Sequence, residues 1–87
     1  MMARRNDITA ARDRLTLDCA TRSDRVKVVG VSGQRRLVHR LAALGVVPGA
    51  VLTVVRPKGP ALVTVGGARI AIGHTAARAI EVEMVTG

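Results

Sequence analysis

The side chains that could carry out catalysis or bind a metal are few and lie far apart in the sequence. The residues considered for these roles are Cys19, Asp24, His39, His74, Glu81 and Glu83. General acid–base catalysis needs a histidine or a carboxylate beside a tuned partner in a cleft. A zinc site needs closely spaced ligands, as in CxxC or HxxxH. The sequence shows neither pattern, so it predicts no catalytic residues, no metal site and no bound cofactor.

The charge of the chain points to an anionic partner. The chain has 14 Lys and Arg against 6 Asp and Glu, which gives a net charge of +8. This balance suits nucleic acid, an anionic membrane surface or an acidic protein. Phe, Tyr and Trp are absent, so the stacking platforms of single-strand-binding barrels and the aromatic grooves that dock proline-rich peptides are both missing. We expect no specific nucleic-acid binding, and docking through aliphatic surface, a strand edge or charge.

The size of the chain and its apolar stretches indicate one small domain outside the membrane. A chain of 87 residues can bury one modest core. Cys19 is the single cysteine, so no intrachain disulfide forms, which fits a reducing compartment. The longest apolar stretch, residues 41–55, is interrupted by Gly and Pro and is shorter than the roughly 20 residues that span a bilayer. We expect a cytoplasmic protein without membrane insertion.

One amphipathic helix, at about residues 34–45, organises the expected fold. At 100° per residue, Leu37, Leu41 and Leu44 form one apolar stripe, with Arg36 and Arg40 together on its flank. The stripe predicts that the helix packs on the core and plugs an otherwise all-β domain.

Small residues mark both ends of this helix. Ser32 or the Gly33 peptide can cap the N-terminus of the helix, and Gly45 suits the left-handed position after its last turn. Pro48 and Gly49 fit the two central positions of a type II turn, because Pro presets φ and Gly accepts a positive φ. The sequence therefore predicts a helix that ends in a tight turn.

The rest of the chain reads as short strands. Strands are expected at 26–31, 50–56, 61–65, 69–72 and 80–84, with a hairpin turn at Gly66-Gly67 and a short C-terminal helical turn at 73–78. Residues 15–24 form an entry segment, and residues 1–14 a flexible basic tail. About five strands with one inserted helix predict a mainly β fold, a small SH3-like barrel over residues 15–87.

The order of these motifs resembles the FeoA family, ferrous iron transport protein A. Arg36-Leu37 is followed by Leu44-Gly45 and, after two residues, by Pro48-Gly49 and a hydrophobic strand. The segments 69–72 and 77–82 continue the same pattern, so the resemblance covers about residues 15–85.

The resemblance implies a small cytosolic SH3-like accessory protein of bacterial ferrous iron uptake. Members of the family are thought to act on the membrane GTPase-transporter FeoB from its cytoplasmic side, which would place this chain at the inner face of the membrane through its partner. As the docking face we predict Arg36, Leu37, Arg40, Leu44, Gly45, Pro48 and Gly49. An open strand edge would also allow weak association between copies.

Two other interpretations of the sequence remain open. The same barrel type occurs as the C-terminal domain of iron-dependent repressors, although we expect this chain not to repress alone because its sequence carries no helix-turn-helix domain. The positive charge also allows a basic barrel associated with RNA or the ribosome.

Overall fold

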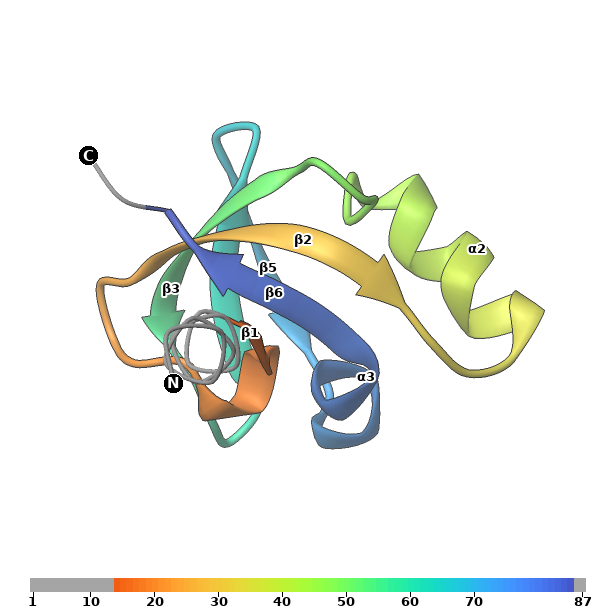
Figure 1. Cartoon of the computed structure of the whole chain (residues 1–87), viewed down its shortest axis with the longest axis horizontal. Helices are drawn as coiled ribbons and strands as arrows, with labels where there is room; N and C mark the ends of the chain where they lie inside the picture. The colour runs from red at the N-terminus through yellow and green to blue at the C-terminus, as the bar shows by residue number, and fades with distance from the viewer. Residues whose placement is uncertain (1–13, 86–87) are drawn as a thin grey trace, which may run out of the picture.

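The six strands that the structure describes form one antiparallel sheet that curves around an aliphatic core. The computed structural model describes residues 14–85. The strands are β1 (Arg14–Thr16), β2 (Arg25–Val31), β3 (Val51–Arg56), β4 (Ala61–Val65), β5 (Ala68–Ile72) and β6 (Ile80–Met84). The helices are the 3-10 helix η1 (Leu17–Cys19), α2 (Arg35–Ala43) and α3 (His74–Ala79). The strand order is β1-β6-β2-β3-β4-β5, and Figure 1 shows the strands wrapping around one another. The expected mainly β, SH3-like architecture is confirmed.

Alternation along each strand sends the aliphatic side chains inward. In β6, Ile80 and Val82 are fully buried while Glu81 is exposed. The same period-2 pattern in β2, β3 and β4 buries Val26, Val28, Leu52, Val54, Ala61 and Val63. These residues, with Leu17, Val46, Ile72 and Ala77, fill the interior without an aromatic ring. A core of Val, Leu, Ile and Ala is therefore sufficient for a domain of this size.

The hairpin and the last strand agree closely with the sequence prediction. Gly66 and Gly67 join β4 to β5 with φ of +56° and +83°, the two positive values that a primed two-residue turn requires. The final strand has the predicted limits, Ile80–Met84, and the helical turn before it runs from His74 to Ala79.

The first strand was not predicted. β1 has three residues, and Leu15 pairs with Val82 of β6. Three residues are too few to show an alternating pattern, so this segment was expected only as an entry to the fold. The described part of the chain therefore has one strand more than the five that were predicted. The remainder of the predicted basic tail, residues 1–13, lies outside the described residues.

The prediction that the long helix plugs the barrel was wrong. Figure 1 shows α2 projecting beside the sheet, beyond the end of β2. Of its residues only Leu41 is buried, while Leu37 is half-buried and Leu44 follows the helix as an exposed residue. The core is instead covered by η1 and α3, which contact each other and contribute the buried Leu17 and Ala77.

Candidate protein-docking surface

The segment from α2 to the start of β3 stands out from the barrel, and its anchoring begins at the N-terminal end of the helix. Gln34 precedes α2 in an extended conformation and makes no side-chain capping bond. The predicted cap, Ser32, has another role: its N–H and its hydroxyl both donate to the carbonyl of Ala79, at 2.8 and 3.3 Å. Gly33 lies between Ser32 and Gln34 in the sequence, and its φ of +100° turns the chain. The helix therefore starts from a fixed corner between β2 and α3.

The C-terminal end of α2 is a Schellman motif. The N–H of Val46 donates to the carbonyl of Leu41, and the N–H of Gly45 donates to Ala42, each at 2.9 Å. Gly45 has φ of +92°, the left-handed conformation that this motif needs and that glycine adopts without strain. Leu41 and Val46 are both buried, so the motif carries its usual hydrophobic contact. The predicted position of Gly45 is confirmed.

A type II turn then ties the segment to β2. Ala50 N–H donates to the carbonyl of Val47 at 2.9 Å, and Gly49 has φ of +95°, as predicted for the Pro48-Gly49 pair. Gly49 N–H also donates to the carbonyl of Val28, and Val28 N–H donates to Ala50, both at 2.8 Å. The turn is thus held on both sides by the backbone of β2.

This anchoring leaves large aliphatic side chains in solvent. Leu44 is 45% exposed, Val47 39% and Val51 40%. Arg36 and Arg40 are exposed as well, and their spacing places them on the same ridge of α2 as Leu44, one turn apart at each step. We call Arg36, Arg40, Leu44, Val47 and Val51 the α2 docking surface.

The predicted docking residues divide into two groups. Gly45, Pro48 and Gly49 set the backbone of the helix end and the turn, and Leu37 packs half-buried against the core. Arg36, Arg40 and Leu44 are left available to a partner. Val47 and Val51, which are also exposed, were not among the predicted residues. The alternation in β3 could have revealed Val51, because Leu52 and Val54 point inward.

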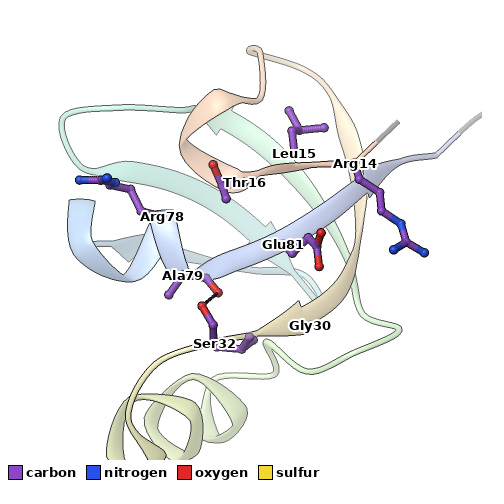
Figure 2. Close-up of a pocket in the computed structure, with 9 residues that line it drawn as sticks. Arg14, Leu15, Thr16, Gly30, Ser32, Arg78, Ala79 and Glu81 are labelled. Atoms are coloured by element: carbon purple, nitrogen blue, oxygen red, sulfur yellow. Dashed lines mark hydrogen bonds between the residues drawn. The ribbon is translucent and has the colours of Figure 1, made fainter. Parts of the chain in front are cut away.

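A second candidate for a functional site is the groove in Figure 2, where β1, β6 and the end of β2 meet. It has a volume of about 560 Å³. Glu81 lies between Thr16 of β1 and Gly30 of β2, and a side chain at Gly30 would meet no atom within 4 Å. The guanidinium groups of the lining residues Arg14 and Arg78 point away from each other in Figure 2. One carboxylate without a second reacting group does not make a catalytic site.

Potential metal ligands do not gather within residues 14–85. No group of three or more His, Cys, Asp or Glu in this range could hold an ion. Cys19 is an exposed free thiol, contacted at 3.6 Å by the hydroxyl of Thr16. None of the helices in the same range is long and apolar enough to cross a bilayer.

Solved structures of FeoA proteins are similar to this one. An iron uptake regulatory protein (FeoA) is 30% identical with a TM-score of 0.77, and the match covers 83% of this chain and 97% of that one. The FeoA protein from Chlorobium tepidum is 29% identical with a TM-score of 0.76, covering 84% and 72%.

A manganese-dependent transcriptional repressor shares the fold. It is 22% identical with a TM-score of 0.77, and the match covers 83% of this chain but 41% of the repressor. The fold relation to repressor barrels expected from the sequence is therefore present. Curated protein sequences gave no match.

The model of the FeoA domain family matches residues 15–84. This range includes α2, the Pro48-Gly49 turn and strands β2 to β6, the segments in which the sequence motifs lie. The chain belongs to the FeoA family.

Proposed function

We propose that this protein is a non-enzymatic accessory protein of bacterial ferrous iron uptake. It docks through the α2 docking surface onto the cytoplasmic part of the membrane GTPase-transporter FeoB. It would thereby work in the cytoplasm, at the inner face of the membrane, without entering the bilayer. Membership of the FeoA family supports the link to ferrous iron transport.

The observation that carries the proposal is the exposure of Leu44, Val47 and Val51 next to two arginines. Several large aliphatic side chains exposed within one short segment that hydrogen bonds fix are typical of a surface that another protein covers. The Schellman motif and the type II turn hold this segment rigid before binding, which reduces the entropy lost on association.

The arginines on the helix ridge define the chemistry of the partner. Arg36 and Arg40 are one turn apart, and α2 carries no carboxylate that could pair with them. A partner with acidic side chains beside an aliphatic patch would complement both parts of the surface. Charge pairing of this kind raises the association rate and fixes the orientation of the complex.

Co-purification with FeoB from bacterial membranes tests the proposal. We expect the wild-type protein to retain an FeoB-type GTPase, and the R36E/R40E variant to lose it. The matched control is R25E/R69E, which has the same net charge but alters the sheet instead of the helix. Equal retention of FeoB by wild type and a folded R36E/R40E variant would rule out this docking surface.

A further inference from the structure

A row of four polar side chains crosses the outer face of the sheet and adjoins the α2 docking surface only at Val51, two residues before Thr53 in β3. The register pairs Arg25 of β2 with Thr53 of β3, Thr53 with Thr64 of β4, and Thr64 with Arg69 of β5. The four residues therefore stand side by side on four adjacent strands, whose order is visible in Figure 1. We call this row the Arg-Thr-Thr-Arg strip.

The strip faces solvent because its strand neighbours face the core. Val26, Leu52, Val54 and Val63 are at most 1% exposed. Since successive side chains in a strand alternate between the two faces, Arg25, Thr53 and Thr64 point outward. Arg69 lies on the same face because it is paired directly with Thr64. Arg25 and Arg69 are exposed, and the two threonines are partly exposed.

Among residues 14–85, no carboxylate stands within the strip. The sequence contains no Asp or Glu from Arg25 through Ile80, so β3, β4 and β5 carry none. The preceding residue, Asp24, accepts a hydrogen bond from Thr21 N–H at 2.8 Å within its own loop. The ion pair in this region, Lys27 with Glu83, lies between β2 and β6, beside the strip and outside it.

A groove of about 470 Å³ adds two more arginines next to the strip. It is lined by Arg22, Ser23 and Arg56, and it reaches the strip at Thr53. The Nε of Arg56 donates to the carbonyl of Pro60 at 3.2 Å. This bond orients the guanidinium, whose terminal nitrogens make no hydrogen bond to other side chains or carbonyls within residues 14–85. The groove and the strip together present arginines and hydroxyls with no carboxylate among the lining residues.

We propose that the strip and this groove bind the phosphate backbone of a single-stranded nucleic acid without reading its sequence. Guanidinium and hydroxyl groups are donors for phosphate oxygens, which are the usual targets of Arg and Thr in nucleic-acid complexes. Arg25 and Arg69 are three strand spacings apart, about 14 Å. A strand with successive phosphates can therefore contact both arginines at once.

The composition of the strip favours nucleic acid over a lipid surface. Binding at a bilayer interface draws on apolar side chains that enter the acyl region, and the exposed large hydrophobics, Leu44, Val47 and Val51, belong to the α2 docking surface. The absence of aromatic residues excludes base stacking on aromatic rings. The contact is therefore electrostatic, independent of sequence and sensitive to salt.

Fluorescence anisotropy with a labelled oligouridylate tests this proposal. The whole chain is titrated into the probe between about 50 and 200 mM salt, the range over which phosphate contacts weaken strongly. We expect R25Q/R69Q to bind about tenfold more weakly at the lowest salt, because two charge-assisted contacts are lost. Its slope of log affinity against log salt should be shallower by about 1.4, since each phosphate contact on a single strand contributes about 0.7.

The matched control is R36Q/R40Q, which loses the same charge from α2. It should bind oligouridylate like the wild type and fail to retain FeoB, whereas R25Q/R69Q should retain FeoB. Failure of this proposal is therefore distinguishable from failure of the FeoB proposal.

Several outcomes would overturn the assignment of the strip. One is that R25Q/R69Q and R36Q/R40Q lose the same amount of affinity for oligouridylate. Another is that the wild type does not bind oligouridylate at the lowest salt. A further one is that polyglutamate displaces the probe as well as unlabelled oligouridylate of the same charge does. Binding of anionic vesicles that depends on Arg25 and Arg69 would also contradict it. The T53V/T64V variant gives a second measurement: we expect weaker binding with an unchanged salt slope, because hydroxyls are lost without a change in charge.

Discussion

The amide of Val46 donates a hydrogen bond to the carbonyl of Leu41 at 2.9 Å, and both side chains are buried. This pair fixes where α2 ends and how the chain returns to the sheet. Leu44 lies between the two residues in sequence and is left 45% exposed. Leu44 is thus exposed because the buried residues Leu41 and Val46 fix the chain on either side of it. The α2 docking surface depends on this buried pair.

Truncation of Val46 should destabilise the protein. V46A removes two methyl groups from a site that is 1% exposed, and we expect a loss of about 2 kcal/mol in the free energy of unfolding. Urea denaturation followed by circular dichroism measures it. The control is V47A at a 39% exposed position, which should change the stability by less than about 0.5 kcal/mol. Similar losses in both variants would contradict the anchoring role of Val46.

A side chain at Gly45 should also destabilise the protein, through the backbone and not through a clash. The added Cβ of G45A would meet Val65 Cγ2 at 3.5 Å, an ordinary contact, but the residue has φ of +92°. The left-handed conformation costs an L-residue about 1 kcal/mol. We therefore expect G45A to lose about 1 kcal/mol in the free energy of unfolding, measured by urea denaturation. G30A is the control, because Gly30 lacks a positive φ and has open space around it. A G45A variant as stable as G30A would show that the motif tolerates a side chain.

Local patterns predicted the turns and most strands of this fold. The glycines at 45, 49, 66 and 67 all have positive φ, and each was assigned from the conformation that its turn demands. The alternation of Ile80, Glu81 and Val82 gave the last strand its limits. These features depend on residues close in sequence, which is why the sequence alone was sufficient.

The features that the sequence did not predict depend on distant residues. The leucine stripe gives the direction of the apolar face of α2, but the position of the helix follows from hydrogen bonds to Ala79 and Val28 at its two ends. The strand β1 exists because Leu15 pairs with Val82. The Arg-Thr-Thr-Arg strip likewise appears only once the register of four strands is known. In each case the determining contact lies far away in the chain.

The ion pair on the sheet surface should contribute little to stability. Lys27 Nζ and Glu83 Oε1 are 3.6 Å apart, with side chains 48% and 34% exposed. We expect E83Q to lose less than about 0.5 kcal/mol at low salt, and to match the wild type in 1 M NaCl, where the Debye length is about 3 Å. Chemical denaturation by urea at the two salt concentrations checks this. A loss above 1 kcal/mol that persists in high salt would mean that the pair is more rigid than its exposure implies.

Replacement of Leu44 should separate binding from folding. L44D places a carboxylate on the ridge beside Arg40, at a position where 45% of the residue is in solvent, so we expect a change of less than about 1 kcal/mol in unfolding free energy. Association with FeoB should fall at least about tenfold, because a charge would be buried in the aliphatic part of the interface. The comparison is L41A, which empties a buried site and should cost about 3 kcal/mol of stability. Binding assays and urea denaturation on both variants distinguish the roles of the two leucines. If L44D binds FeoB like the wild type while remaining folded, the exposed end of α2 does not contact the transporter, and the aliphatic surface must serve a different partner.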